Sequence, residues 1–429
     1  MKITYINIEN FKAIDSLQFN PRMLNILVGR NNTGKTSILQ AIKLSLDEKY
    51  FSRLFYLRPS AALKYGENSA QFKLKLIEDK RNEVRVQIVK ISILELIPQI
   101  GIAVNRIFKL ALKRAENSGR RKLKNEERYS RVDEIEKKLK ELLNEETMLE
   151  MVEKSHLTNL AKESVKIIVD GQTNFVSGRA IGFIASELAF QIAEKLNIKK
   201  FLGWKEPRHV HFLFYEVLDY PLEYLTFTPD ETESVKNEEE NLSSPIFIDD
   251  PIEEIAKIIS DRKRQEVIAH EIEHIIKEDN LVQGLTRFNF NKMVFEGVEY
   301  DVSMDSMGDG FKALVGIMAS LYQQPKNTIV LLEEPEVHMH PGYMQELTKN
   351  LVILSRSRNI QFFISTHSMD LIQCFLDVDM MSTLESEFVK SQFFMLRMSH
   401  PKNVVVSEQI DYTEAERAIK ELEWDLRGI

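Results

Sequence analysis

The stretch GRNNTGKTS, residues 29–37, decides the fold of this chain. A glycine, four residues and then the triplet GKT at 34–36 are typical of a loop whose backbone N–H groups hold phosphates. The apolar run 23–28 before the loop predicts a strand, and the run 37–46 after it has helical spacing. A strand, this loop and a helix in that order predict an α/β fold of P-loop type.

The loop also predicts how a nucleotide is held. Lys35 supplies positive charge to the β and γ phosphates, and Thr36 gives its hydroxyl to Mg²⁺. The backbone N–H groups at the start of a helix, where the helix dipole is positive, favour anions. The residues predicted to bind ATP with this loop are Gly29, Arg30, Asn31, Asn32, Thr33, Gly34, Lys35, Thr36 and Ser37.

Hydrolysis needs a second set of residues, an acid for the hydrated metal and a residue that positions or activates water. The apolar run IVLL at 329–332 ends in two carboxylates, Glu333 and Glu334. Buried strands rarely end in paired charges without a ligand. We therefore predict that Glu333 joins Thr36 at Mg²⁺ and that Glu334 faces the γ-phosphate.

Two further stretches complete the set. DSMGDGFK places Ser306, Gly308 and Asp309 at the opening of an apolar helix, which predicts a second phosphate contact. In FFISTHS, His367 directly follows an apolar strand, where a neutral imidazole can hydrogen-bond a γ-phosphate. The alternative for His367 is an ordinary polar residue at a strand end.

Composition bounds the class of protein. The chain has 429 residues, 43% of them hydrophobic and 28% charged, which is ordinary for a globular protein of two or three domains. Its net charge of -8 argues against a surface that coats nucleic acid everywhere. The single cysteine, Cys374, and the lack of a leader or an unbroken apolar span favour a cytoplasmic location without a membrane.

Changes of character along the chain predict three parts, an N-terminal lobe at 1–95, a mainly helical insertion at 96–244 and a C-terminal lobe at 245–429. Strands are expected at 70–79 and 83–94, and one long helix at 252–277. The segment from Arg106 to Arg131 holds ten Lys or Arg against three Glu. It is either a DNA-contacting arm or a solvated helix face, because aromatic residues for base stacking are scarce there.

In the order of these motifs the chain resembles the heads of ABC-type ATPases such as the SMC and RecF proteins. SMGDGFK is similar to their LSGGEKQ signature, with Met307 in place of the first glycine. GRNNTGKT, EEPEVHMHP and STHS are similar to motifs of OLD-like prokaryotic ATPases, which are often catalogued as AAA-type domains. The resemblance covers about residues 1–95 and 245–429.

The resemblance implies roles for single residues. Lys35 binds phosphate, Thr36 and Glu333 bind magnesium, Glu334 is the catalytic glutamate and His367 is a switch histidine. Ser306 and Gly308 act on the ATP of a second subunit in a head-to-head homodimer. Glu336, His338 and His340 occupy the position at which such heads touch their partner. A further glutamine of the family is either Gln71 or Gln87.

The resemblance also implies a role in DNA maintenance or antiviral defence, with an effector in a separate protein. OLD nucleases carry an additional nuclease domain, and the 62 residues after His367 are too few for it. A non-hydrolysing ATP sensor that scaffolds a partner is one alternative function. A zinc peptidase is another, because AHEIEH places His270, Glu271 and His274 in the spacing of a zinc-protease helix, with Glu296 or Glu299 as the third ligand.

Overall fold

The structure is a computed structural model. It describes residues 1–47, 59–77, 79, 82–117, 125–153, 164–176, 179–210, 226–227, 245–260, 262–278, 284–290, 292–297, 300–399 and 405–420. The chain divides into two compact units. Unit 1 comprises residues 1–47, 72–84 and 237–429, and unit 2 comprises residues 48–71 and 85–236.

Unit 1 holds the motifs. Its strands are β1 (Lys2–Phe11), β2 (Ile14–Phe19), β3 (Leu24–Gly29), most of β4 (Ser69–Ile77), β9 (Ile246–Ile248), β10 (Leu285–Asn289), β11 (Lys292–Phe295), β12 (Ile329–Glu333), β13 (Gln361–Thr366), β14 (Phe393–Ser399) and β15 (Val406–Asp411). Its helices are α1 (Lys35–Leu46), α10 (Pro251–Ser260), α11 (Arg262–Glu278), η2 (Met304–Ser306), α12 (Asp309–Tyr322), α13 (Pro341–Arg358), α14 (Met369–Leu376), η3 (Val378–Met380), α15 (Thr383–Gln392) and α16 (Tyr412–Lys420).

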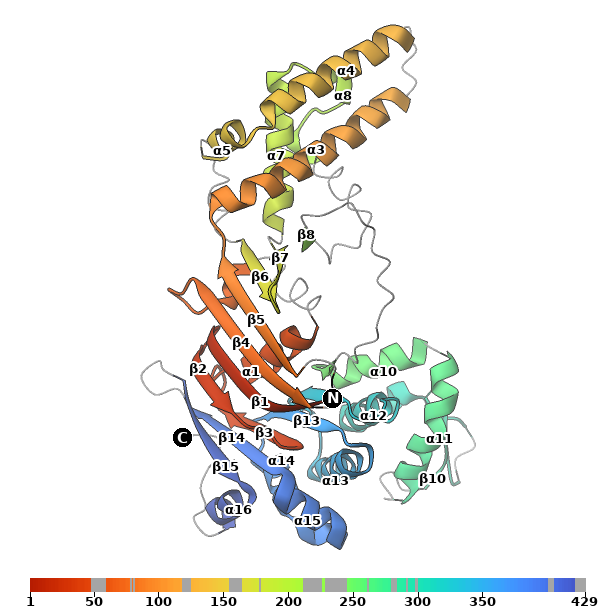
Figure 1. Cartoon of the computed structure of the whole chain (residues 1–429). Coiled ribbons are helices and arrows are strands. Elements are labelled where there is room, and N and C mark those ends of the chain that lie inside the picture. The colour runs from red at the N-terminus through yellow and green to blue at the C-terminus, as the bar shows by residue number, and fades with distance from the viewer. Residues whose placement is uncertain are drawn as a thin grey trace. The chain divides into compact units, whose positions relative to one another are not determined.

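A six-stranded sheet forms the centre of unit 1, in the order β15-β14-β3-β13-β12-β9 (Figure 1). Each pair of adjacent strands in this sheet is parallel, except the pair β14 and β15, which is antiparallel. Strands β3, β12 and β13 are buried at almost every position, as expected for parallel strands covered on both faces. Because their carboxyl ends lie at one edge, the residues after the three strands come together there.

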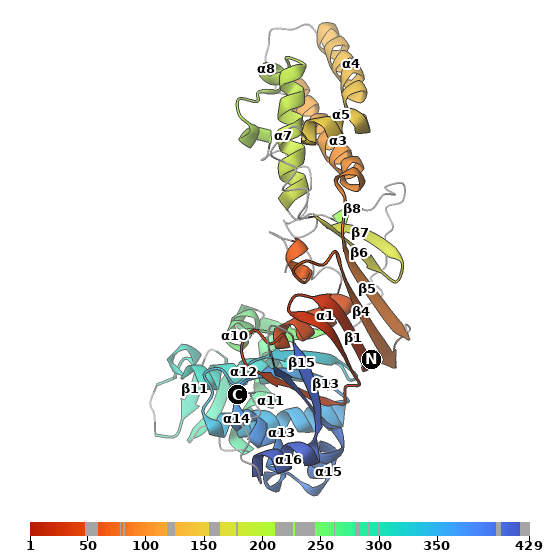
Figure 2. The ribbon, with the colours of Figure 1, turned by 90° about the vertical axis from the view of Figure 1, so that its left-hand side faces the viewer.

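Helices and strands cover the two faces of this sheet. Leu24, Ile26 and Val28 on one face of β3 pack in a core with residues of α12, α13 and α14. Figures 1 and 2 both show α13, α14 and α15 on the same side of the sheet. Helix α1 contacts β3, β12 and β13 and also β1. It therefore lies between this sheet and the strands β2-β1-β4, which are neighbours in a second sheet.

Unit 2 contains both helices and strands. Its elements are η1 (Pro59–Ala62), most of β5 (Glu83–Lys90), α3 (Ile93–Asn117), α4 (Asn125–Leu142), α5 (Glu145–Glu153), β6 (Val165–Val169), β7 (Gln172–Val176), α7 (Arg179–Lys195), α8 (Lys199–Leu202) and β8 (Thr226–Phe227). Strands β5 to β8 are sequential neighbours, antiparallel in each pair. A separate core joins α3, α4, α5 and α7 around Phe108 and Trp204.

The structure corrects two expectations about single elements. The helix expected at 252–277 is two helices, α10 and α11, and α10 packs on α12. Gly316 of α12 permits this packing, because a Cβ there would lie 2.1 Å from the carbonyl oxygen of Pro251. The strand expected at 83–94 ends at Lys90, and α3 begins at Ile93. Ser92 caps this helix, because its side chain accepts a hydrogen bond from the Glu95 N–H.

Among the helices in the described part of the chain, none combines the length and the apolar character needed to cross a membrane.

Candidate nucleotide site

The phosphate loop of unit 1 turns directly from β3 into α1. Gly34 precedes the helix in a left-handed conformation with φ 96°, and no side chain caps the first turn. The first N–H groups of α1 thus have no side-chain acceptor in this structure, which is the arrangement that binds an anion. Arg30, Asn31 and Asn32 are exposed around the loop, whereas Thr33 and Lys35 are buried.

Two glycines are required by the path of this loop. Gly29 has φ 154°, and a Cβ there would lie 2.3 Å from the carbonyl oxygen of Met398 on β14. Gly34 also has positive φ, and its Cβ would lie 3.2 Å from Ile14. The sequence spacing therefore reflects a close approach of the loop to neighbouring strands as well as its turn.

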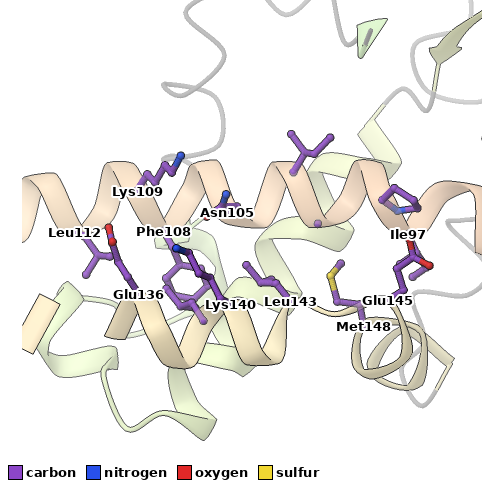
Figure 3. Close-up of a pocket in the computed structure, with 14 residues that line it drawn as sticks. Ile97, Asn105, Phe108, Lys109, Leu112, Glu136, Lys140, Leu143, Glu145 and Met148 are labelled. Carbon is purple, nitrogen blue, oxygen red and sulfur yellow. The ribbon is translucent and has the colours of Figure 1, made fainter. Parts of the chain in front are cut away.

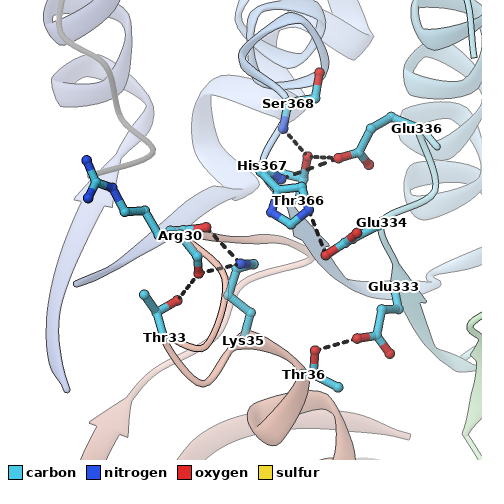
Figure 4. A network of polar contacts seen from close by, with 11 residues as sticks. Arg30, Thr33, Lys35, Thr36, Glu333, Glu334, Glu336, Thr366, His367 and Ser368 are labelled. Carbon is cyan, nitrogen blue, oxygen red and sulfur yellow. Dashed lines mark hydrogen bonds and ion pairs between the residues drawn. The ribbon is translucent and has the colours of Figure 1, made fainter. Parts of the chain in front are cut away.

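Lys35 points back into the loop (Figure 4). Its Nζ donates hydrogen bonds to the carbonyl oxygens of Gly29 at 2.7 Å and Arg30 at 3.0 Å. The Thr33 hydroxyl also donates to Arg30, at 2.8 Å. Burial lowers the pKa of Lys35, while the nearby Glu334 and Glu333 partly oppose this effect. The ammonium group is thus held over the loop in the position where phosphates would be bound.

Thr36 and Glu333 meet as the sequence predicts. The Thr36 hydroxyl donates a hydrogen bond to Oε1 of Glu333, which ends β12. Burial raises the pKa of Glu333, and the charges of Glu334 and Asp249 raise it further. A hydroxyl beside carboxylate oxygens is a donor set that suits Mg²⁺. This pair therefore fits a magnesium ion bound beside the phosphates.

Glu334 and His367 form a second pair. Oε1 of Glu334 lies 2.8 Å from Nε2 of His367, and Figure 4 shows the two side chains pointing toward each other. Glu334 has φ 45°, a strained conformation for a residue with a side chain. Its N–H is held by the carbonyl oxygen of Ser365 at 2.9 Å. The glutamate and the histidine that separate motifs single out are thus in direct contact.

The phosphate loop, Glu334 and His367 line one cavity of about 410 Å³, whereas Glu333 contacts Thr36 but is not among the lining residues. The residues that line the cavity are Ala13, Asn31, Asn32, Thr33, Gly34, Lys35, Thr36, Ser37, Glu334 and His367. Ser306 and Gly308 are exposed residues that do not line it. Gly308 caps α12, so the first turn of that helix begins at Asp309 in a solvent-facing position. One chain thus brings together the phosphate loop, the carboxylates and the histidine, but not the serine-glycine signature.

The loop after β12, residues 334–340, carries the three residues for which the resemblance implies contact with a partner. Glu336 is buried, and its Oε1 accepts hydrogen bonds from the Thr366 hydroxyl and the His367 N–H. Its carboxylate therefore faces the interior of this chain. His338 and His340 are exposed, but His340 also caps α13 by accepting a hydrogen bond from the Gly342 N–H. Pro341 at the first position of that helix fits this cap.

Sequence reasoning missed Asp249. Parallel pairing sets Ile248 of β9 opposite Leu332 of β12, so Asp249 follows β9 where Glu333 ends β12. The run PIFIDD carried the signal, because an acid after an apolar strand belongs to the same sheet edge. Gln71 and Gln87, between which the sequence left the choice open, both lie on strands that reach into unit 2, and neither lines the cavity.

The His-Glu-x-x-His stretch lies on α11. His270, Glu271 and His274 are exposed, while Ile268 and Ile272 face the core. Glu296 is exposed as well, and Glu299 lies outside the described residues. Among the residues that the structure describes, no three His, Cys, Asp or Glu side chains form a group that could hold a metal ion.

Unit 2 has a groove of about 630 Å³ between α3, α4 and α5 (Figure 3). Apolar side chains, among them Ile97, Phe108, Leu139 and Met148, line its floor. Lys109, on α3, and Glu136, on α4, are exposed at its edge. No sequence motif pointed to this groove.

Comparison with known proteins identifies the family. The sequence matches the family described as AAA ATPase domain over residues 1–372. The chain belongs to the AAA ATPase domain family. This confirms the expectation, drawn from the motifs, of an α/β P-loop ATPase of the kind catalogued as AAA-type domains. ATP binding and hydrolysis are the activities of this family of proteins.

Two curated relatives match shorter stretches of this AAA ATPase domain chain. An ATP/GTP phosphatase of Helicobacter pylori (strain ATCC 700392 / 26695) is 27% identical over 128 residues, which are 28% of this chain and 33% of the relative. Uncharacterized protein MJECL11 of Methanocaldococcus jannaschii is 34% identical over 71 residues, 17% of this chain and 61% of the relative. The matches thus span about one third and three fifths of the two relatives.

Among solved structures, the chain is similar to an SMC head domain from Thermotoga maritima, with TM-score 0.43, 13% identity and coverage of 96% of this chain and 100% of that one. It is also similar to an Smc head domain bound to the C-terminal domain of ScpA from Pyrococcus furiosus, with TM-score 0.41, 13% identity and coverage of 98% and 99%.

Proposed function

We propose that this chain is an ATP-hydrolysing switch that closes as a head-to-head dimer on two ATP molecules. The observation that carries the proposal is the single cavity in which the phosphate loop meets both Glu334 and His367. Lys35 binds the β and γ phosphates, and the first N–H groups of α1 surround them. Thr36 and Glu333 would hold a magnesium ion, which would supply positive charge to the phosphate oxygens.

Glu334 and His367 then divide the remaining chemistry. The Glu334 carboxylate orients the attacking water and accepts its proton, for which its position at the cavity wall is suited. His367 hydrogen-bonds Glu334 before ATP enters. When its Nε2–H turns to a γ-phosphate oxygen, the carboxylate is freed for water. The pair thus couples arrival of the γ-phosphate to activation of the base.

The proposed dimerisation rests on two residues of the signature that do not line the cavity of their own chain. Ser306 and Gly308 are exposed at the start of α12, where a hydroxyl and N–H groups can bind a phosphate. We propose that they contact the ATP bound to the second chain, so that closure of the dimer completes each site. The binding energy of two shared nucleotides favours the closed state, and hydrolysis reverses it.

The variant Glu334→Gln tests the proposal. Its amide keeps the size of the side chain but cannot accept a proton, so we expect turnover to fall about 10²- to 10⁴-fold. ATP affinity should remain, and the variant should accumulate as an ATP-bound dimer in sedimentation or scattering measurements. The control is Glu385→Gln, a substitution in the capping box of α15. A dimer that never forms with ATP and magnesium would contradict the proposal.

The same variant separates this proposal from an ATP sensor that binds without hydrolysis. A sensor should show equal, near-zero turnover in the wild type and in Glu334→Gln. Its ATP-dependent dimerisation should also be the same in both. The comparison therefore assigns the chain to one class or the other.

We further propose that unit 2 is an insertion that serves a partner or DNA, in DNA maintenance or antiviral defence with a separate effector. Arg106, Lys109 and Lys113 lie on one side of α3, and the last two are exposed. Arg120, Arg121, Lys122 and Lys124 of the same basic run lie outside the described residues. Clustered cations bind DNA by releasing its counterions.

The double charge reversal of Lys109 and Lys113 to Glu tests DNA binding. It should lower the slope of log affinity against log salt by about 2, since each lost phosphate contact removes about 0.9. The double charge reversal of Lys199 and Lys200 on α8 is the matched control in the same unit. An unchanged slope of log affinity against log salt would show that Lys109 and Lys113 of α3 do not contact DNA.

A further inference from the structure

Glu336 is a buried acid that belongs neither to the magnesium pair nor to the pair of Glu334 and His367. Its side chain is 7% exposed. Its Oε1 accepts hydrogen bonds from the Thr366 hydroxyl and, at 3.3 Å, from the His367 N–H (Figure 4). Both donors lie where β13 ends, so this carboxylate contacts the backbone of the residue that carries the switch imidazole.

The contacts continue on the far side of His367. The Thr366 hydroxyl accepts a hydrogen bond from the Ser368 N–H at 2.9 Å. The Ser368 side chain in turn caps α14 by accepting one from the Leu371 N–H at 3.2 Å. His367 is therefore fixed between the carboxylate of Glu336 and the first turn of a helix.

One short loop carries the two acids that contact His367. The Val337 N–H donates to the Glu334 carbonyl at 3.1 Å, and the Met339 N–H donates to the Glu336 carbonyl at 2.9 Å. These hydrogen bonds hold the backbone of the loop at Glu334 and at Glu336. Glu336 contacts the backbone of His367, and Glu334 contacts its ring.

The burial of the Glu336 carboxyl group is unfavourable for the stability of the folded protein. Its Oε2 is buried without a hydrogen-bond partner among the described residues, and burial raises the pKa of the carboxyl group. A buried polar atom without a hydrogen-bond partner destabilises the folded state. An apolar side chain would avoid this destabilisation but could not accept the two hydrogen bonds.

We propose that Glu336 is a positioning residue, which holds the backbone of His367 so that the imidazole Nε2 points at Glu334 and at the γ-phosphate of bound ATP. The inference rests on the proposed ATPase function. Glu336 itself touches neither ATP nor water in this scheme. It acts through His367, and the acceptor Oε1, not the charge, is the part that matters.

Two variants of Glu336 separate the acceptor oxygen from the charge. Glu336→Ala removes the acceptor, and turnover should fall about 10- to 100-fold, as expected when a reacting group is misplaced by about 1 Å. ATP affinity should stay within about twofold of the wild type, because the phosphate loop keeps all its contacts. Glu336→Gln keeps an acceptor oxygen and should retain most of the turnover.

Thr366→Val is the second, smaller test, since it deletes one of the two donors without changing volume. Its matched control is Thr348→Val, because the Thr348 hydroxyl on α13 is buried and has no partner among the described residues. We expect loss of turnover for the first variant and none for the second.

A double-mutant cycle with His367→Ala decides whether Glu336 acts through the histidine. In that background Glu336→Ala should cause no further loss of turnover. Equal losses in both backgrounds would show a merely structural role and overturn the inference.

The ring ¹⁵N signal of His367, assigned with His367→Ala, gives a readout without turnover. In Glu336→Ala the Nε2 signal should move toward that of a free imidazole, and in Glu336→Gln it should stay. An unmoved signal in Glu336→Ala overturns this inference. A wild type that binds ATP without turnover overturns the proposed function instead, so the two failures are distinguishable.

Discussion

The nucleotide cavity of unit 1 and the groove of unit 2 hold their polar groups in opposite ways. In and beside the cavity, three charged side chains are held by specific partners: Lys35 by the Gly29 carbonyl within the phosphate loop, Glu333 by Thr36, and Glu334 by His367. In the groove, an apolar floor carries the packing and exposed charges such as Lys109 lie at the edge. A polar site binds its ligand well only if its charged side chains are already held in position by hydrogen bonds, whereas an apolar groove binds through the fit of its surface.

This comparison predicts that the two regions fail independently. Phe108→Ala removes a fully buried ring that packs 5.4 Å from Trp204, so unit 2 should lose about 3–5 kcal/mol of unfolding free energy. ATP affinity should not change. Denaturant unfolding measures the loss of stability, and ATP titration measures the affinity. The control Phe183→Ala, at a side chain 41% exposed, should have a much smaller effect. Loss of ATP binding in Phe108→Ala would contradict the separation.

A second test compares glycines in the two units. Gly29→Ala should destabilise the protein by about 2–4 kcal/mol, because strain at positive φ adds to the contact with the Met398 carbonyl. Gly171 also has positive φ, 88°, but a Cβ there meets nothing within 4 Å. Gly171→Ala should therefore cost only the strain, about 1–2 kcal/mol. Thermal unfolding of both variants gives the difference. Equal costs would mean that the close approach at Gly29 is unimportant.

The smallest expected effect concerns pH. Burial raises the pKa of Glu336, so the folded protein binds this proton more tightly than the unfolded chain does. The resulting stability is fully present below the unfolded-state pKa and is lost as pH rises through the folded-state pKa. Glu336→Gln should flatten this part of the curve of melting temperature against pH. A variant curve parallel to that of the wild type would show that Glu336 does not titrate in this range.

The sequence predicted most of the site because its chemistry lies in contiguous motifs. The strand, loop and helix around Lys35 follow from local spacing, and so do the acids after β12 and the histidine after β13. Asp249 could not be predicted as a site residue in the same way, because its place beside Glu333 depends on which strand pairs with β12. The inward direction of Glu336 depends on contacts with Thr366, which is 30 residues away along the chain.

Other differences have similar causes. The division of 252–277 into α10 and α11 depends on packing against α12, which helical periodicity alone does not contain. The groove of unit 2 arises from three helices that carry no shared motif. Its residues read as ordinary core positions until the helices are assembled.

The contact between Gly310 and the loop after β12 has a mechanical consequence. A Cβ at position 310 would lie 2.5 Å from the carbonyl oxygen of His338, so the first turn of α12 lies directly against that loop. We expect a displacement of the loop to be transmitted to the first turn of α12, because the two backbones leave no space for even a methyl group between them. Under the proposed function, this contact would couple the loop that carries Glu334 to the position of Ser306.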